Sequence, residues 1–162
     1  MRHLIIAFSS FLYTGYFPVA SGTFATLCFV PVYYFIFKDM HPVLYLAITL
    51  VIIFAGIWAS SYAAAVYKKD DPSKVVIDEV AGFLVTMMFI KYTPARLIIG
   101  FFASRIFDII KLPPARQSEK LHGGTGIMLD DVVAGIQANI FMWIVIYFKA
   151  DVALAGLLSR LA

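Results

Sequence analysis

Long stretches without a charged side chain alternate with short polar segments along the chain. No Asp, Glu, Lys or Arg occurs in the 35 residues 3–37, in the 28 residues 40–67, or in the 17 residues 132–148. An α-helix needs about 20 mostly apolar residues to cross the hydrocarbon core of a membrane. The pattern therefore predicts an all-α polytopic membrane bundle of about four to five hydrophobic helices, over residues 22–37, 43–67, 79–91, 95–110 and 130–148.

Two segments allow more than one structural interpretation. Pro94 divides residues 79–110 into two halves that are each short for a full span, so they form a hairpin that either crosses thinly or packs inside the bundle. At the N-terminus, Arg2 followed by the apolar run 4–12 is also the pattern of a cleaved signal peptide. We favour the other interpretation, in which residues 1–162 form a single integral-membrane domain.

The composition agrees with a membrane protein. Apolar residues make up 62% of the chain and charged residues 14%, and the mean hydropathy is +0.88. Soluble domains have roughly 45–50% and 25%, respectively. These values exclude a disordered chain and a coiled coil. The single cysteine, Cys28, excludes an intrachain disulfide and a zinc site built from several cysteines.

Charged residues divide unevenly between the two faces that alternating helices create. One face carries 8 of the 13 basic residues: Arg2, Lys68, Lys69, Lys74, Arg105, Lys111, Arg116 and Lys120. Because loops rich in Lys and Arg stay in the cytoplasm, this face is predicted to be cytoplasmic. Eight of the ten acidic residues share that face: Asp70, Asp71, Asp78, Glu79, Asp108, Glu119, Asp130 and Asp131.

Two segments bring charged residues to the ends of apolar helices. Residues 76–82 carry the adjacent acids Asp78 and Glu79 into a hydrophobic helix, and a later helix places Arg105 and Asp108 three residues apart on one face. Both patterns also have a simple structural interpretation. Acids stabilise helix N-termini through the helix dipole, and Arg105 with Asp108 forms an ordinary ion pair.

A third segment, residues 122–135, runs from a glycine-rich stretch into Asp130 and Asp131, which we expect in the first turn of a helix. Backbone N–H groups of such a loop, before a helix N-terminus, can hold phosphate oxygens. The predicted phosphate-binding glycines are Gly123, Gly124 and Gly126. A flexible turn is the alternative interpretation, because the loop lacks the Lys-Ser/Thr ending of a P-loop.

The number of acids predicts a metal ion. A carboxylate within a membrane helix costs about 2.5–3.5 kcal/mol at mid-depth, and adjacent carboxylates repel one another unless a cation lies between them. A divalent cation supplies that charge, and oxygen ligands without a His or Cys cluster favour Mg²⁺ first and Mn²⁺ second. The expected metal ligands are Asp78, Glu79, Asp130 and Asp131.

These segments resemble motifs of a known family, phosphatidylglycerophosphatase A. The family motifs Gly-x-x-Pro-x-x-x-Gly-Thr, Asp-Glu-x-x-Gly and Arg-x-x-Asp-x-x-Lys are matched by Gly15 to Thr23, Asp78 to Gly82 and Arg105 to Lys111. The motif Gly-Gly-x-Gly-Ile-Met-x-Asp-Asp-x-x-Ala-Gly is matched at every fixed position from Gly123 to Gly135. Family members often have Pro where this chain has Ser21.

The resemblance implies an enzyme of the bacterial inner (cytoplasmic) membrane that hydrolyses phosphatidylglycerophosphate to phosphatidylglycerol and phosphate and requires Mg²⁺. The implied partners are this lipid and the bilayer; we expect no nucleic acid, and the oligomeric state is left unassigned. Thr23 and Lys111 join the three glycines as expected phosphate-binding residues. The expected catalytic residues are Asp78, Glu79, Arg105, Asp108, Asp130 and Asp131.

Alternatives from other classes remain. A membrane cation transporter also uses intramembrane carboxylates, but it predicts acids near mid-membrane instead of at helix ends. For a phosphatase, either water attacks phosphorus directly or an aspartate attacks first, and the absence of an Asp-x-Asp motif favours water. Helical phase adds one structural prediction: the face of Glu79, Gly82 and Thr86 packs against that of Asp131, Gly135 and Asn139.

Overall fold

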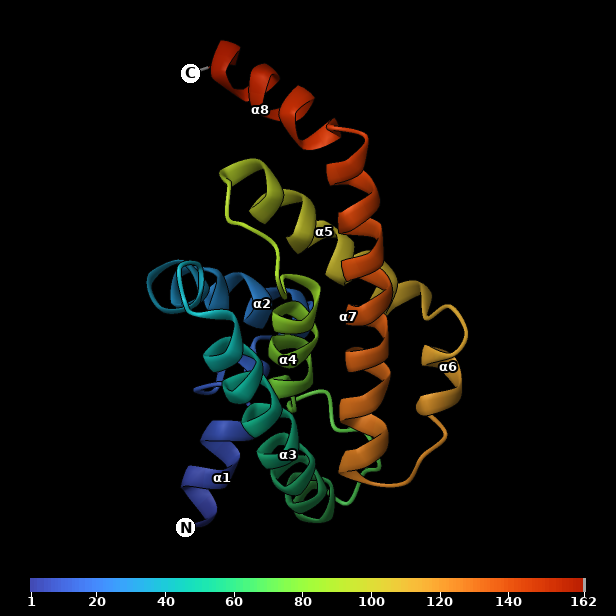
Figure 1. Ribbon diagram of the computed structural model, residues 1–162. Helices are drawn as coiled ribbons and strands as arrows, with labels where there is room; N and C mark the ends of the chain where they lie inside the picture. Colours follow the sequence, from blue (N-terminus) through green and yellow to red (C-terminus); the bar gives the residue numbers. More distant parts are fainter. Residues whose placement is uncertain (162) are drawn as a thin grey trace.

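The computed structural model describes residues 1–161, and over these residues the protein is all-α, as predicted (Figure 1). Long helices are joined by short turns, and two elements, η1 and η2, are non-α helical turns. In chain order the elements are α1 (Arg2–Ser9), η1 (Thr14–Tyr16), α2 (Ser21–Val32), η2 (Tyr33–Phe37), α3 (Pro42–Tyr67), α4 (Ile77–Thr86), α5 (Pro94–Ile110), α6 (Ala115–Ser118), α7 (Gly124–Tyr147) and α8 (Ala150–Leu161).

Helix α4 is the centre of the fold. Figure 1 shows it between α3 and α7, and eight of its ten residues are buried. Ten residues of α-helix extend only about 15 Å, half of the hydrocarbon thickness of a bilayer. The open choice for this segment is thereby decided: α4 packs inside the bundle and does not span a membrane by itself. Its apolar residues form the main core with Phe29, Tyr33 and Met128.

Two glycines allow α4 and α7 to approach each other closely. A methyl group added at Gly82 of α4 would lie 2.9 Å from the carbonyl oxygen of Asp131 in α7. One added at Gly135 would lie 2.5 Å from the carbonyl oxygen of Gly82. Any side chain at these positions would push the helices apart. The predicted contact between the Glu79–Gly82 face and the Asp131–Gly135 face is therefore confirmed.

The C-terminal end of α4 differs from the prediction. We expected a helix to residue 91, but α4 ends at Thr86. The amide of Asn139, in α7, donates hydrogen bonds to the carbonyl oxygens of Thr86 and Met88, each at 2.9 Å. These bonds satisfy backbone groups that water cannot reach, so the chain can leave the helix inside the bundle.

Helix α7 begins six residues earlier than predicted, at Gly124 instead of residue 130. The N–H of Gly124 donates to the hydroxyl of Ser61 in α3 at 3.0 Å, and a side chain at Gly124 would collide with the carbonyl oxygen of Ile57. Glycine is needed here for close helix packing, not for a loop. As a consequence Asp130 and Asp131 lie in the second turn of α7, which corrects the expectation that they occupy the first.

Two helices are long and apolar enough to cross a membrane. Helix α3 has 26 residues with a mean hydropathy of 2.3 over its best window, and α7 has 24 residues with 1.5. Only a third of each window is buried in the protein. Large apolar side chains such as Phe54, Trp58 and Trp143 face outward. Such outward apolar faces indicate membrane association.

Some of the remaining helices agree closely with the prediction, and others were not predicted. The predicted helix 22–37 is α2 continued by η2, and the predicted helix 95–110 is α5, one residue longer at its start. Helices α1, α6 and α8 were not predicted. Helix α8 follows α7 at the end of the bundle away from the N-terminus (Figure 1).

Candidate functional site

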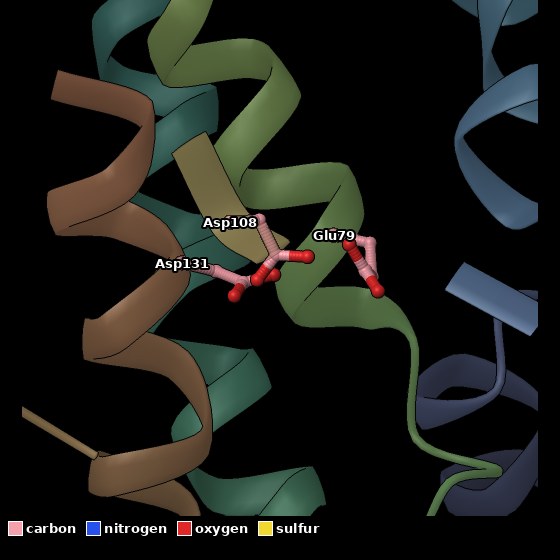
Figure 2. A group of neighbouring side chains, drawn as sticks. All are labelled: Glu79, Asp108 and Asp131. Carbon is pink, nitrogen blue, oxygen red and sulfur yellow. The ribbon is translucent and has the colours of Figure 1, made fainter. Parts of the chain in front are cut away.

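Three carboxylates from three helices converge at one point. Glu79 comes from α4, Asp108 from α5 and Asp131 from α7, and one oxygen of each lies within 4.8 Å of the other two. Figure 2 shows the three side chains directed toward one another. Asp131 is buried, and the other two side chains are partly buried. This triad contains two of the predicted metal ligands, together with Asp108, which was predicted to be catalytic but not a ligand.

Local sequence explains why the three acids meet. Glu79 lies in the first turn of α4, and Asp108 lies close to the C-terminal end of α5. Asp131 is brought beside α4 by the missing side chain of Gly82. Two of the acids therefore lie at helix ends, and the third lies in the second turn of α7.

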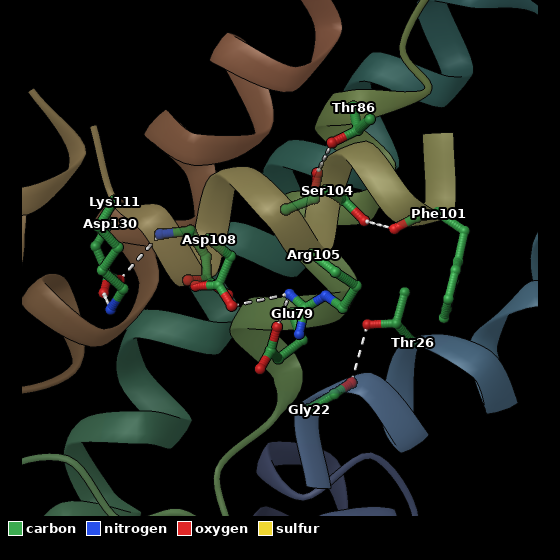
Figure 3. Close-up of polar contacts among 12 residues, drawn as sticks. Gly22, Thr26, Glu79, Thr86, Phe101, Ser104, Arg105, Asp108, Lys111 and Asp130 are labelled. Atoms are coloured by element: carbon green, nitrogen blue, oxygen red, sulfur yellow. Dashed lines mark hydrogen bonds and ion pairs between the residues drawn. The ribbon is translucent and has the colours of Figure 1, made fainter. Parts of the chain in front are cut away.

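Arg105 is the cation of the triad. It forms ion pairs with Glu79 and, through Nη2, with Asp108 Oδ2 at 3.2 Å (Figure 3). Its Nε is buried and has no hydrogen-bond partner in the part of the chain that the structure describes. A buried guanidinium holds two carboxylates at fixed positions, because its donors form a rigid planar fork. Arg105 thus orients Glu79 and Asp108, and it neutralises only one of their two charges.

Lys111 and Asp130 form a second ion pair beside the triad. Lys111 Nζ lies 2.6 Å from Asp130 Oδ2 and 3.7 Å from Glu119 Oε1. The other oxygen of Asp130 accepts the N–H of Asp131 at 2.9 Å. Burial lowers the pKa of Lys111, but the hydrogen bond and the negative charge of Asp130 outweigh this and raise it above its usual range. Lys111 is therefore a permanent cation at the site.

The triad and this ion pair open into one cavity of about 250 Å³. Six carboxylates line it, and they include every acid of the predicted site. The lining residues that carry charge or a hydroxyl group are Ser21, Asp71, Ser73, Asp78, Glu79, Asp108, Lys111, Asp130 and Asp131. Asp71 was predicted on the same face as these acids but outside the motifs, and Ser21 was given no role. Nothing in the spacing of these two residues indicates that they belong to the site.

The N-terminus of α2 closes one side of the site. A side chain at Gly22 would collide with the carboxylate of Glu79 and lie 3.1 Å from Arg105 Nη1. The hydroxyl of Ser21 donates to the carbonyl oxygen of Ser73 at 2.9 Å, which ties α2 to the segment that precedes α4. Thr23, predicted to bind phosphate, lies in the same first turn of α2 and is half-buried.

The glycine-rich segment lines a second cavity, next to the one that contains the triad. Gly124 gives its N–H to Ser61, and Gly126 gives its N–H to the carbonyl oxygen of Gly123 at 3.1 Å. Gly123 and Gly126 line a neighbouring cavity of about 210 Å³, together with His122. This cavity shares Asp71, Ile127 and Asp130 with the first. Gly124 thus packs against α3, whereas Gly123 and Gly126 line the second cavity.

The donor set at the triad fits a hard divalent cation. The candidate ligands are all carboxylate oxygens, which Mg²⁺ prefers. Asp78 Oδ1 and Asp131 Oδ2 are buried and accept no hydrogen bond within the described residues. Burial and the charges of Glu79, Asp130 and Asp71 raise the pKa of Asp78 well above its usual value. Buried carboxylate oxygens without a partner are the groups that a metal ion would satisfy.

Comparison with known proteins agrees with this geometry. Residues 7–146 match the family described as phosphatidylglycerophosphatase A. Phosphatidylglycerophosphatase A of Escherichia coli is 31% identical over 76% of this chain and 72% of its own length, and that of Haemophilus influenzae is 29% identical over 83% and 84%. A Bacteroides thetaiotaomicron protein, named as a proposed phosphatidylinositol-3-phosphatase, is 32% identical over 80% and 85%. No solved structure matches the chain significantly.

The chain therefore belongs to the phosphatidylglycerophosphatase A family, a family of lipid phosphatases, as its motifs indicated. The matched range contains every candidate site residue from Thr23 to Asp131.

Proposed function

We propose that this protein removes the terminal phosphate of phosphatidylglycerophosphate and so produces phosphatidylglycerol and inorganic phosphate. The observation that carries the proposal is the triad Glu79, Asp108 and Asp131, which lies in a cavity with Arg105 and Lys111 beside it. Carboxylates that hold a divalent cation, next to fixed cationic side chains, form the common arrangement for phosphoryl transfer. Membership of the family supports the lipid substrate.

Mg²⁺ is the proposed cofactor, held by Glu79, Asp108 and Asp131. When bound, it supplies positive charge to the oxygens of the transferring phosphoryl group. The transporter alternative is less well supported, because membership of a phosphatase family and the position of two of the triad acids at helix ends both favour hydrolysis.

The proposed roles of the other side chains follow from their positions. Arg105 keeps Glu79 and Asp108 in place and adds charge for the phosphoryl oxygens. Lys111, exposed to the cavity, exchanges part of its contact with Asp130 for the phosphate of the substrate. In the reaction, water adds to phosphorus, the bond from phosphorus to the glycerol oxygen breaks, and that oxygen takes up a proton.

We further propose that the protein spans the bacterial inner membrane several times, with the triad on the cytoplasmic face. Support comes from the apolar helices α3 and α7 and from the eight basic residues predicted on that face. Single cysteines at Ser73 and Gln117, in a Cys28→Ala background, should react with a membrane-impermeant thiol reagent only from the cytoplasm. A cysteine at the exposed Asp39 should react from the periplasm, and the reverse pattern would refute the orientation.

Phosphatidylinositol 3-phosphate is a second candidate substrate. The Bacteroides relative, named for phosphatidylinositol 3-phosphate, is as similar to this chain as the two phosphatidylglycerophosphatases are. Both lipids present a phosphate monoester on a polar headgroup, and the triad with Arg105 addresses only that monoester. The two substrates differ in the headgroup between phosphate and lipid, so the choice lies in the walls of the cavity.

The test is phosphate release by the purified protein in mixed micelles. The panel contains phosphatidylglycerophosphate, phosphatidylinositol 3-phosphate and phosphatidic acid, each with Mg²⁺ and with a chelator. We expect the highest kcat/KM on phosphatidylglycerophosphate. After chelation we expect no phosphate release from any lipid. A preference for the inositol lipid would favour the second candidate. Release of no phosphate from any of the three would overturn the proposed function.

A further inference from the structure

The cavity holds more negative charge than one divalent cation can balance. Six carboxylates line it, and among residues 1–161 only Arg105 and Lys111 form ion pairs with the acids of the cavity lining. When all six are ionised, as metal ligands must be, four negative charges are left uncompensated. One divalent ion would reduce this to two, and a phosphate monoester entering at neutral pH would add between about 1.5 and 2 further negative charges. A site in this state would repel the substrate that the proposed function assigns to it.

The carboxylates differ in how well they are satisfied. Both oxygens of Asp130 have partners, Lys111 and the N–H of Asp131, and Glu79 and Asp108 both pair with Arg105. Asp78 has no cation within ion-pair distance among the described residues, and its Oδ1 is enclosed without a hydrogen bond.

Asp131 also has one oxygen without a hydrogen-bond partner among the described residues. Its side chain is more than nine-tenths buried, it lines the cavity, and its Oδ2 accepts no hydrogen bond. One oxygen of Asp131 suffices for the triad, and a carboxylate has a second oxygen that can serve another ligand. Asp78 and Asp131 both line the cavity that contains the triad.

We propose that the site binds two divalent cations, with Asp131 as the carboxylate that bridges them. The first ion occupies the triad, and the second is held by Asp78 and the other oxygen of Asp131. Paired ions in phosphatases and nucleases lie about 3.5–4 Å apart, a spacing that one bridging carboxylate can maintain. Two divalent ions neutralise all four uncompensated charges, so that the phosphate dianion enters a cavity without net negative charge. This proposal rests on the proposed function for the first ion only.

Manganese is the probe, because it replaces Mg²⁺ at oxygen sites and is paramagnetic. Metal-free, full-length protein in detergent is titrated with Mn²⁺ and followed by calorimetry and electron paramagnetic resonance. We expect two ions per chain and a spin-coupled spectrum, since ions at this spacing interact magnetically. A single ion with an uncoupled spectrum would overturn the second site while leaving a one-metal phosphatase intact. Binding of no ion would remove the metal from the proposed function as well.

Asp78→Asn identifies the ligand. The variant keeps the size of the side chain and removes its charge, so it should bind one Mn²⁺ with an uncoupled spectrum. Asp39→Asn, which removes an exposed acid far from the cavity, is the matched control and should keep two coupled ions. Two coupled ions in Asp78→Asn would overturn the assignment of this residue. Circular dichroism confirms the folded state of each variant, and the stoichiometry of the unmodified protein tests the proposal even if one variant does not fold.

Discussion

Helix α5 carries two arginines nine residues apart, and they contact different numbers of acids. Arg96, near its start, binds one carboxylate, with Nε 2.7 Å from Asp151 Oδ2 of α8, and also donates to the carbonyl oxygen of Lys91. Arg105, near its end, faces Glu79 and Asp108 together, and further acids lie behind them. The first cluster is balanced in charge, and the second has a large excess of acid.

The difference shows how a structural ion pair can be distinguished from a ligand-binding site. A single Arg with a single Asp satisfies both charges, and its effect is to fix α8 against α5. An excess of carboxylates weakens the fold unless a ligand compensates it, so its presence indicates a ligand. Residue type alone does not separate the two clusters. The ratio of acidic to basic side chains does.

Asp131→Asn should have the largest effect on turnover. It removes one metal-binding charge but keeps the volume of the side chain in its tight contact with α4. Because losing even outer partners of metal ligands lowers activity or metal affinity by about 10–100-fold, we expect kcat to fall by at least about 100-fold. Phosphate release at saturating lipid measures this effect.

The thermal stability of metal-free Asp131→Asn should not fall, since one of several repelling carboxylates has been neutralised. Asp39→Asn is the control for turnover. Near-normal turnover in Asp131→Asn, at limiting Mg²⁺, would place the triad outside the reaction and erase the functional difference between the two ends of α5.

Arg105→Lys should come next. Lysine keeps the charge but lacks the planar fork that contacts Glu79 and Asp108 at once. We expect kcat/KM to fall about 10–100-fold, a loss of roughly 1.4–2.7 kcal/mol in transition-state stabilisation. Arg96→Lys is the matched change on the same helix and should leave kcat/KM unaltered. Equal losses in both variants would show that the two arginines act only on the stability of α5.

Gly82→Ala should have a smaller effect on both stability and turnover. Its methyl group would lie 2.9 Å from the carbonyl oxygen of Asp131, so α4 and α7 must separate by a few tenths of an ångström. Overpacking of this kind costs about 1–3 kcal/mol, and the shift moves Glu79 away from Asp131. We expect a several-fold loss of kcat with a lower melting temperature.

Gly156→Ala is the control for Gly82→Ala, because a methyl group at Gly156 of α8 meets nothing within 4 Å. Alanine is the better helix former, so this variant should be as stable as the original or slightly more so. A loss of activity in Gly156→Ala comparable to that in Gly82→Ala would contradict the role given to the α4–α7 contact.

The sequence predicts the features that depend on neighbouring residues and misses those that depend on residues far away in the chain. Local periodicity placed Glu79 and Asp131 on facing helix surfaces, because Gly82 and Gly135 lie on the same faces. The end of α4 was missed because it depends on Asn139, more than 50 residues away.

The site shows the same limit. The charge excess predicted a metal from the sequence, and the donor set agrees with that chemistry. The grouping of Asp108 with Glu79 and Asp131, and the pairing of Lys111 with Asp130, depend on how α5 crosses α7. The start of α7 was misjudged because glycine is typical of loops, whereas Gly124 packs against Ile57.

Asp151→Asn should have the smallest effect on turnover, and it tests the other half of the comparison. The change leaves Arg96 partly buried without its counter-charge, and breaking such a pair from one side costs about 3 kcal/mol or more. The melting temperature in detergent should therefore fall, and α8 should become more accessible to proteolysis. Phosphate release measured well below that temperature should stay within about twofold of the original, because no acid of the triad contacts Arg96 or Asp151. If turnover instead fell as far as in Asp131→Asn, the balanced cluster would be coupled to the reaction, and charge balance would fail as the criterion that separates a structural ion pair from a site.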